Sequence, residues 1–528
     1  MPTPTNEAFW LNETYDPTNP LVGLQTIDGG IDGEVVFTSG YYAPGDGGGG
    51  EFYWALGNTD TVDNGITFAG NTSAGRWKRV YSGPINVRWF GAKGDTVTDD
   101  TVNLQNALDY AVGSLYFPDG TYKITGTGDA CLTMTKNVNL LADKSRTTRI
   151  VGVGCGSNTS LIKVAITDNG GAGDVRELQI RNLEFLNSGG GKHAIEIAGT
   201  MANIQFLMFG CNVHAGTHVD GRAVYCTNMS FGGFENNTFS PGISLVGPGS
   251  ADGLRVEKNT FLGAAMALIL DIEEGSYSHS IEKNVFTNRD GAIHVINGSQ
   301  VKIRNNQIEH ALSNGGVNSG LHECHIWIEG RSYTSEAITI EDNNFGGGSN
   351  LKVLMYIDKA KKTFISRNYL IAPGLQSDPA AFDVVFTENS SYNYFEQSNI
   401  IVGTQANPRP AKPFPAVIQD SGVGNFGVVQ PSSTLNLQNT WTGGDYVKLS
   451  DGFVTFLSAL NGGNTAPGLI GTFPTGFLPA DFSTVIISTS GGPASLALTP
   501  AGTFSAASPL PANADVAWYT RFLCENLG

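Results

Sequence analysis

The sequence predicts an all-β protein whose central part is a right-handed parallel β-helix. The main observation is a six-residue pattern, apolar–x–x–Asn–x–apolar, that recurs along the middle of the chain. Its copies begin at Phe234, Val256, Ile281, Ile303, Ile340 and Ile365. The interval is 22 residues from position 234 to 256 and 37 from position 303 to 340. A repeat of this length indicates one supersecondary unit stacked on itself.

The composition supports many short strands joined by tight turns. The 528 residues include 68 glycines, and only 15% are charged. The net charge of −17 argues against nucleic acid as a partner because phosphates would be repelled. No run of about 18 apolar residues is present, so we expect no membrane span. The cysteines form no CxxC pair and the histidines no ligand set, so we expect no metal and no cofactor.

Residues 1–85 are predicted to form an N-terminal lead and a small β domain. Short apolar and aromatic runs at Val35–Phe37, Phe52–Trp54 and Trp77–Val80 read as its strands. Glycine-rich stretches separate these runs, which suits turns between antiparallel strands.

A capping helix is predicted over about 100–112. Leu104, Ala107, Leu108 and Ala111 fall at i, i+3, i+4 and i+7, which is one helical stripe. Either of two residues before it, Thr98 or Asp99, is able to serve as the N-cap. An amphipathic helix here would cover the open end of a stack of strands, which otherwise templates aggregation.

Residues 86–407 are predicted to form the β-helix. In each hexad the two apolar residues point inward, and the Asn between them suits a strand–turn–strand corner. Asn tolerates left-handed backbone and can bond the Asn of the next coil in a ladder. Residues 311–323 are an insertion that loops out of one coil.

The repeat stops after residue 407. Residues 408–439, which include the proline-rich stretch Pro408–Pro415, are predicted to be a linker. Residues 440–528 contain alternating strands with Gly and Pro turns, a pattern typical of a β-sandwich.

Several motifs resemble known phage proteins. The segment from Phe90 to Asp100 (FGAKGDTVTDD) and Leu115–Tyr122 resemble the start of the pectate-lyase-like β-helix superfamily. Gly40–Gly50 and Gly75–Arg79 resemble the short domain that precedes it in many bacteriophage tailspikes. Asp445–Phe456 is similar to the C-terminal sandwich of phage tail fibres. The resemblance implies a homotrimeric tailspike in the virion tail, made in the host cytoplasm and contacting other tail proteins. It also implies that the protein binds and cleaves bacterial capsule or O-antigen polysaccharide.

Alternate residues of a strand face opposite sides, which predicts one outward face across four coils. The predicted inward pairs are Ile195/Ile197, Leu270/Ile272, Ile293/Val295, Ile326/Ile328 and Met355/Ile357. One outward column then reads Glu196, Asp271, His294, Trp327 and Tyr356, and the next reads Ala198, Glu273, Ile296, Glu329 and Asp358. His325 and Arg331 lie at the margins. The apolar Ile296 leaves a one-residue slip open at that coil.

This face is predicted to be a sugar-binding groove, because aromatic faces stack on pyranose rings and carboxylates bind hydroxyls. His294, Trp327, Tyr356, His325 and Arg331 are the predicted substrate-binding residues. Glycoside hydrolysis needs two carboxyls, about 6.5–9.5 Å apart for inversion and about 5–5.5 Å for retention. Glu329 is predicted as the acid because Trp327 would raise its pKa, with Asp271 or Glu273 as the base. Glu329 with Asp358, one coil apart, would suit retention.

Three alternatives remain open at this point. Outward acids on so acidic a protein can simply be solvated. A lyase would need a base and a cation to hold a uronate carboxylate, and His294 with Arg331 or Lys359 are its candidates. A non-catalytic adhesin would bind polysaccharide without cleaving it.

Overall fold

The chain divides into two compact units, residues 1–263 and 264–528. The computed structural model describes residues 9–11, 23–166, 176–198, 201–227, 229–246, 253–263, 266–272, 278–288, 291–309, 324–346, 353–371, 382–386, 390, 393–395 and 399–402, and after these the strands alone. The predicted insertion 311–323 and Glu273 lie outside these residues.

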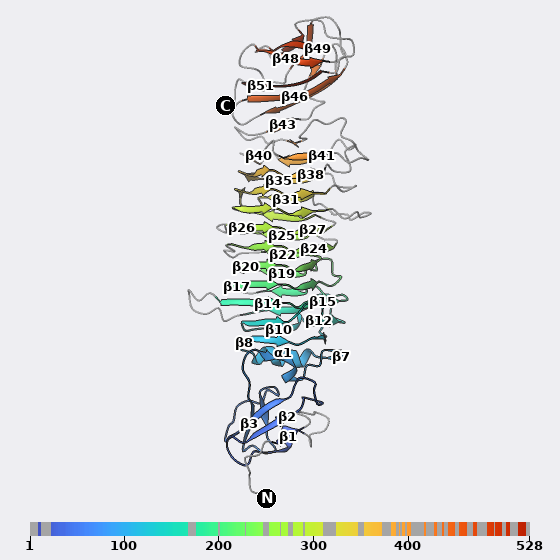
Figure 1. The fold of residues 1–528 in the computed structure, drawn as a ribbon. Helices are drawn as coiled ribbons and strands as arrows, with labels where there is room; N and C mark the ends of the chain where they lie inside the picture. Colours follow the sequence, from blue (N-terminus) through green and yellow to red (C-terminus); the bar gives the residue numbers. More distant parts are fainter. Residues whose placement is uncertain are drawn as a thin grey trace. The chain divides into compact units, whose positions relative to one another are not determined.

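The first unit begins with a small sheet in the order β1-β2-β3-β5-β4, which Figure 1 draws in dark blue. Its strands are β1 (Phe9–Leu11), β2 (Val35–Thr38), β3 (Gly50–Leu56), β4 (Thr67–Ala69) and β5 (Gly75–Arg79), with a 3-10 turn at Leu24–Thr26. Three of them lie where the apolar runs predict strands. Trp54 and Trp77 pack together in its core, with ring centroids 5.1 Å apart.

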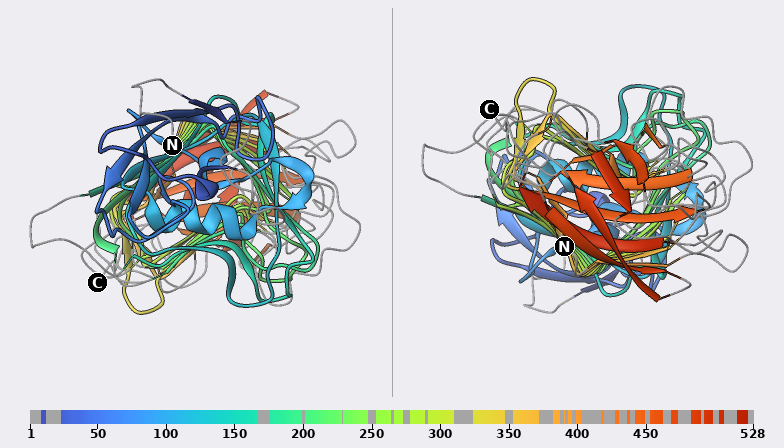
Figure 2. Two further views of the ribbon diagram at one scale, coloured as in Figure 1. Left: turned by 90° about the horizontal axis from the view of Figure 1, so that it is seen from below. Right: turned by 90° about the horizontal axis from the view of Figure 1, so that it is seen from above.

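The predicted capping helix is present as α1 (Thr101–Tyr110), which follows a 3-10 turn at Val87–Phe90. Its apolar stripe is buried as predicted. The cap position is Asp100, one residue later than predicted, and its carboxylate accepts from the backbone N–H groups of Lys93 and Gly94. The predicted Asp99 supplies the side-chain bond to the first turn, because its Oδ1 accepts from the backbone N–H of Thr101 at 3.0 Å. The Gln105 side chain bonds both backbone polar groups of Thr133 in the first coil, so α1 covers that end of the stack (Figure 2).

The coils of the first unit form three parallel sheets, here called sheets I, II and III in the order in which the chain visits them. Sheet I holds β6 (Ile85–Asn86), β8 (Gly113–Phe117), β11 (Val138–Ala142), β14 (Arg176–Arg181), β17 (Met201–Phe209), β20 (Met229–Glu235) and β23 (Arg255–Glu257). Sheet II holds β7 (Asp95–Asp99), β9 (Gly120–Ile124), β12 (Thr148–Val153), β15 (Glu184–Ser188), β18 (Asn212–His214), β21 (Thr238–Ser240) and β24 (Thr260–Gly263). Sheet III holds β10 (Ala130–Met134), β13 (Ser160–Val164), β16 (Ile195–Ile197), β19 (Val224–Thr227) and β22 (Ile243–Val246).

The second unit repeats the same three-sheet coil, which confirms the parallel β-helix. Sheet I holds β26 (His279–Glu282), β29 (Val301–Arg304), β33 (Thr339–Glu341), β37 (Phe364–Ser366) and β40 (Tyr394–Phe395). Sheet II holds β27 (Val285–Asn288), β30 (Gln307–Ile308), β34 (Asn344–Phe345), β38 (Tyr369–Ile371) and β41 (Ile400–Val402). Sheet III holds β25 (Leu268–Asp271), β28 (Ile293–Ile296), β31 (Cys324–Glu329), β35 (Val353–Asp358), β39 (Phe382–Phe386) and β42 (Val417–Ile418). A short pair, β32 (Ser335–Glu336) and β36 (Ala360–Lys361), joins two turns.

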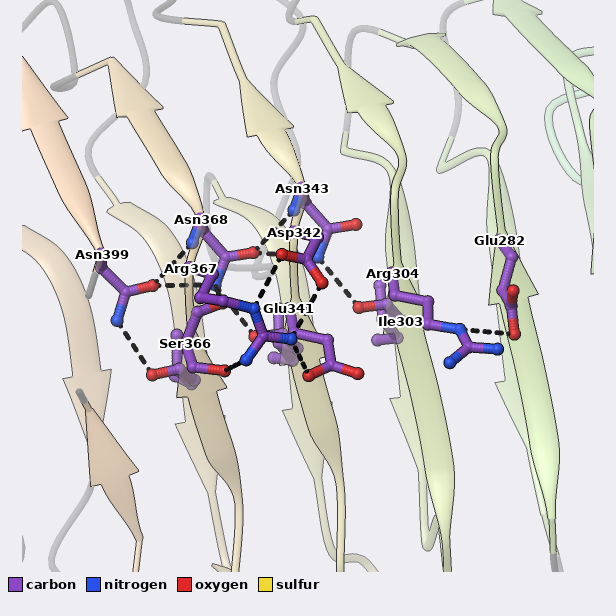
Figure 3. Close-up of polar contacts among 12 residues, drawn as sticks. Glu282, Ile303, Arg304, Glu341, Asp342, Asn343, Ser366, Arg367, Asn368 and Asn399 are labelled. Carbon is purple, nitrogen blue, oxygen red and sulfur yellow. Dashed lines mark hydrogen bonds and ion pairs between the residues drawn. The ribbon is translucent and has the colours of Figure 1, made fainter.

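The hexad forms the corner between sheets I and II, and its Asn residues form the predicted ladder (Figure 3). Each amide Nδ2 donates to the Oδ1 of the next coil, at 2.9 Å from Asn306 to Asn343 and 3.0 Å from Asn343 to Asn368. The same Oδ1 of Asn343 also accepts from the backbone N–H of Asn306 at 3.0 Å. All three side chains are buried.

The left-handed backbone, however, belongs to the residue before each ladder Asn. Positive φ values occur at Asn236, Lys258, Lys283, Asn305, Asp342 and Arg367. The prediction that the ladder Asn supplies this conformation was therefore wrong. The Asn is selected for its buried amide, which has a donor and an acceptor for its neighbours.

The last part of the second unit is a nine-stranded antiparallel sheet, in the order β43-β45-β46-β51-β48-β49-β50-β47-β44. Its strands are β43 (Gly427–Val429), β44 (Asn436–Leu437), β45 (Thr442–Lys448), β46 (Phe453–Asn461), β47 (Gly468–Thr472), β48 (Ser483–Thr489), β49 (Gly492–Leu498), β50 (Thr503–Ala506) and β51 (Val516–Leu523). The predicted linker 408–439 thus contains three short strands. Of these, β42 pairs with β39 in sheet III, and β43 and β44 pair within the antiparallel sheet. The sandwich arrangement stays a prediction.

Candidate active site

The predicted face is the outer surface of sheet III in the second unit, on β25, β28, β31 and β35. The predicted inward residues of β28, β31 and β35 are buried, and so are Ile195 and Ile197 of the first unit. His294 lies opposite Trp327, and Trp327 lies opposite Tyr356. Ile296 lies opposite Glu329, which lies opposite Asp358. No slip occurs at Ile296.

The register predicted for β25 was wrong by two residues. The pair opposite Ile293 and Val295 is Leu268 and Leu270, so Asp271 lies opposite Ile296 and not opposite His294. The segment Leu268–Ile272 offers two equivalent inward pairs, 268/270 and 270/272, and alternation alone does not distinguish between them. The shift puts Asp271 in the same column as Glu329.

Asp271 and Glu329 are two coils apart in this column, about 9.6 Å at the backbone. The buried Ile296 lies between them. The Arg331 guanidinium reaches both carboxylates, at 2.7 Å from Nε to Glu329 Oε1 and 3.9 Å from Nη1 to Asp271 Oδ2. Because one planar guanidinium contacts both oxygens, Glu329 Oε1 and Asp271 Oδ2 are less than about 9 Å apart.

His294 is the fourth member of this cluster. Its Nε2 donates to Glu329 Oε1 at 3.0 Å. Burial lowers the pKa of the imidazole, although the hydrogen bond to Glu329 opposes the shift. The ring is therefore neutral at neutral pH and serves as a hydrogen-bond donor to the carboxylate.

The two carboxyl groups have pKa values shifted in opposite directions. Burial raises the pKa of Asp271, although Arg331 and His294 oppose that shift. Burial also favours a raised pKa for Glu329, but the hydrogen bond from His294 and the positive charge and hydrogen bond of Arg331 oppose it, and the pKa is lowered. The pKa of Glu329 is therefore lowered, and not raised as predicted.

The aromatic side chains of this face are more buried than side chains that stack on a sugar ring need to be. The His294 and Trp327 rings stack with centroids 4.0 Å apart and planes at 3°. Trp327 is only 6% exposed, and the half-buried Tyr356 packs against it. Trp327 thus supports the site from within and leaves little surface for the predicted substrate contact.

His325 is also removed from the groove. It is 1% exposed, and its Nε2 donates to the carbonyl of Gly346 at 2.8 Å. The ring is therefore withdrawn from any substrate on this face, because it is buried and bonded to Gly346 directly after β34. Arg331, by contrast, was expected at the margin but contacts both acids of the cluster, with 53% of its side chain exposed.

Sequence reasoning missed two polar residues beside the cluster, Asn297 and Ser335. Asn297 follows β28 in left-handed conformation, and its amide oxygen accepts from the backbone N–H of Arg331 at 2.8 Å. Ser335 Oγ donates to the carbonyl of Glu329 at 2.8 Å. An Asn-Gly pair directly after a predicted strand indicates a turn. This signal was present at position 297, but it does not indicate which backbone groups the Asn side chain contacts.

Among the described residues no group of three or more His, Cys, Asp or Glu side chains is arranged to hold a metal ion. A helix long and apolar enough to cross a membrane is likewise absent from the described part of the chain. What the cluster offers is general acid–base chemistry from two carboxyls, with a guanidinium between them.

Two family models match the chain. Residues 21–82 match the phage tail protein small four-stranded beta-sheet domain, and residues 84–319 match the rhamnogalacturonase A/epimerase, pectate lyase-like model. The chain is thus similar to a phage-tail β domain over the first range and to a pectate-lyase-like domain over the second. The pectate-lyase-like match includes Asp271 and His294 and ends before Glu329 and Arg331.

Curated relatives match this chain over short segments. Mannuronan C5-epimerase AlgE2 of Azotobacter vinelandii is 43% identical over 63 residues, 11% of this chain and 6% of the epimerase. A Mu-like prophage FluMu defective tail fiber protein of Haemophilus influenzae is 36% identical over 104 residues, 20% of this chain and 15% of that protein. The chain thus spans a small part of each relative.

Two similar solved structures are tailspikes. The enzymatically active domain of tailspike protein 2 from bacteriophage CBA120 has a TM-score of 0.49 at 11% identity, covering 94% of this chain and 79% of that one. The tailspike of Acinetobacter phage vB_ApiP_P1 has a TM-score of 0.43 at 14% identity, covering 98% and 99%.

Proposed function

We propose that this protein is a phage tailspike that depolymerises a bacterial surface polysaccharide, capsule or O-antigen, by hydrolysis of its glycosidic bonds. The observation that carries the proposal is the pair Asp271 and Glu329, bridged by Arg331 and shifted in pKa in opposite directions. The phage-tail β domain next to a pectate-lyase-like domain supports a polysaccharide-acting protein of the virion tail.

Asp271 is the general acid in this proposal and Glu329 the base, which reverses the roles expected from sequence. A raised pKa favours the protonated form of Asp271, which gives its proton to the glycosidic oxygen as the bond to the anomeric carbon breaks. The lowered pKa keeps Glu329 ionised, so that it takes a proton from the water that attacks that carbon. Their separation across two coils favours inversion over retention.

The neighbouring residues orient these groups and the sugar. Neutral His294 holds the Glu329 carboxylate by its Nε2–H, and Trp327 fixes the imidazole by stacking. Arg331 leaves the gap between the acids when a sugar ring enters, since its side chain is half exposed. Tyr356 and Asp358, one coil further, bind hydroxyls of the next sugar unit.

The test uses polysaccharide purified from the phage's host bacterium. Wild-type protein is expected to generate new reducing ends, with inverted anomeric configuration in the first product detected by NMR. Glu329→Gln and Asp271→Asn are expected to abolish cleavage while polysaccharide binding remains. Glu341→Gln, which removes a carboxylate of the sheet I corner, is the matched control and keeps activity. Binding without new reducing ends in the wild type would instead establish an adhesin.

One observation favours a second candidate, a polysaccharide lyase. Arg331 lies beside Asp271, Glu329 and His294, each of which is able to accept or donate a proton. It is therefore placed to hold a uronate carboxylate while neutral His294 takes the neighbouring proton. β-Elimination leaves an unsaturated uronate that absorbs ultraviolet light. Its appearance during digestion would replace hydrolysis as the proposed reaction.

We also propose that the protein is a homotrimer that attaches to other tail proteins of the virion. Trimerisation through the C-terminal sheet would bring three β-helices side by side. Light scattering after gel filtration of the full chain measures the mass directly, and a value of one 55.9 kDa chain would overturn the trimer.

A further inference from the structure

Asn297 connects the candidate site to the turn that carries Arg331. It follows β28 with φ of 56°, and its side-chain oxygen accepts three consecutive backbone N–H groups. The distances to Oδ1 are 2.8 Å from Arg331, 3.1 Å from Ser332 and 3.2 Å from Tyr333. The amide oxygen therefore holds the whole turn at the level of the preceding coil.

Two further contacts fix the ends of the same turn. Ser335 Oγ donates to the carbonyl of Glu329 and accepts from the backbone N–H of Gly298 at 3.1 Å. Lys359 Nζ donates to the carbonyl of Arg331 at 3.1 Å. The backbone of the turn is thus tied to the coils before and after it, while the Arg331 side chain remains half exposed.

The backbone conformation alone does not require an asparagine at position 297. Lys258, Lys283 and Arg367 adopt left-handed conformation at the hexad corners with φ between 51° and 56°. What asparagine adds at position 297 is a short side chain with an acceptor aimed at the next coil. This distinguishes it from Asn305, which has φ of 55° and an exposed side chain.

We propose that Asn297 is a positioning residue that sets the protonation of the cluster through Arg331. The structural part of this inference stands by itself, and its consequence for catalysis rests on the proposed hydrolysis. By clamping the turn, Asn297 keeps the guanidinium between Asp271 and Glu329. The Arg331 charge opposes the raised pKa of Asp271 and contributes to the lowered pKa values of Glu329 and His294.

The decisive variant is Asn297→Gly, because glycine adopts left-handed backbone freely and only the acceptor is lost. Asn305→Gly is the matched control with nearly the same φ. The readout is the titration of His294, followed by NMR on full-length protein with labelled histidine and assigned with His294→Gln. Its charged neighbours in the cluster are Glu329, Arg331 and Asp271.

The His294 pKa is expected to rise by roughly 0.5–1 unit in Asn297→Gly and in Arg331→Ala, since a nearby positive charge is withdrawn or removed. The double variant should rise no further, and Asn305→Gly should match the wild type. A rise in Arg331→Ala without one in Asn297→Gly would overturn the positioning role, as would additive shifts in the double variant.

The activity profile separates this inference from the proposed function. If polysaccharide is cleaved, both limbs of the pH profile of kcat/KM move to higher pH in Asn297→Gly. This profile reports the free enzyme, in which both carboxyls lose the Arg331 charge. If the wild type cleaves no polysaccharide, the proposed function fails while the histidine titration still decides the role of Asn297.

Discussion

In the described part of the second unit, an arginine lies between two carboxylates at two places, and the pKa of the aspartate shifts in opposite directions. At the sheet I corner, Arg367 contacts Glu341 and Asp342 (Figure 3), and its hydrogen bond lowers the pKa of Asp342. On sheet III, Arg331 contacts Glu329 and Asp271, yet burial keeps the pKa of Asp271 raised. The residue types match, but solvent screens the corner whereas the coils enclose the sheet III cluster.

The two regions also differ in how they follow the repeat. The ladder position is Asn in each hexad from Asn237 to Asn368, because one amide must satisfy the next. The sheet III column changes at every coil, from Asp271 to Ile296, Glu329 and Asp358. The invariant position carries the fold, and the variable position is available for chemistry.

The largest expected effect is on the rate of cleavage, when the sheet III cluster loses a carboxylate. Glu329→Gln should reduce the rate of polysaccharide cleavage by roughly 10²–10⁴-fold, as loss of a general base does. The rate is measured as new reducing ends per minute at saturating polysaccharide. Arg367→Ala at the corner should leave that rate unchanged, and an equal loss in both variants would contradict the contrast.

The next largest effect is expected on stability, when one Asn of the ladder is replaced. Asn343→Leu removes the acceptor for the buried backbone N–H and side-chain amide of Asn306, which should cost about 2–4 kcal/mol. The urea midpoint of the circular dichroism signal measures the loss. Asn344→Leu, one residue on and exposed, should shift the midpoint far less, and similar shifts would argue against the ladder.

The pH dependence of cleavage sharpens the comparison. Activity should fall at low pH as Glu329 is protonated, at a pH below the ordinary glutamate range because its folded pKa is lowered. It should fall again at higher pH as Asp271 ionises, above the ordinary aspartate range because its pKa is raised. The optimum is therefore acidic, and a profile flat from acid to neutral pH would rule out this assignment.

The smallest expected effect is on stability at the corner. Arg367→Ala should move the thermal midpoint little, since exposed ion pairs are screened by water and salt. Melting curves at low and high salt measure it. A large salt-independent drop would mean that the corner pair supports the ladder beside it.

The sequence by itself determined the coil. Each turn has two apolar residues that must face inward and one Asn whose amide must meet the Asn of the next turn. The hexads from Phe234 to Leu370 therefore predicted both the β-helix and its ladder. It also determined α1, because the stripe from Leu104 to Ala111 has helical period and no competing alternation.

Only the tertiary structure decided the register at Asp271, since Leu268, Leu270 and Ile272 serve equally well as inward residues in a pattern of period two. The pKa contrast between Asp271 and Glu329 also required it, because burial and the reach of Arg331 depend on which coils are neighbours. The clamp by Asn297 is a contact across 34 residues, and local sequence does not encode which turn its side chain will meet.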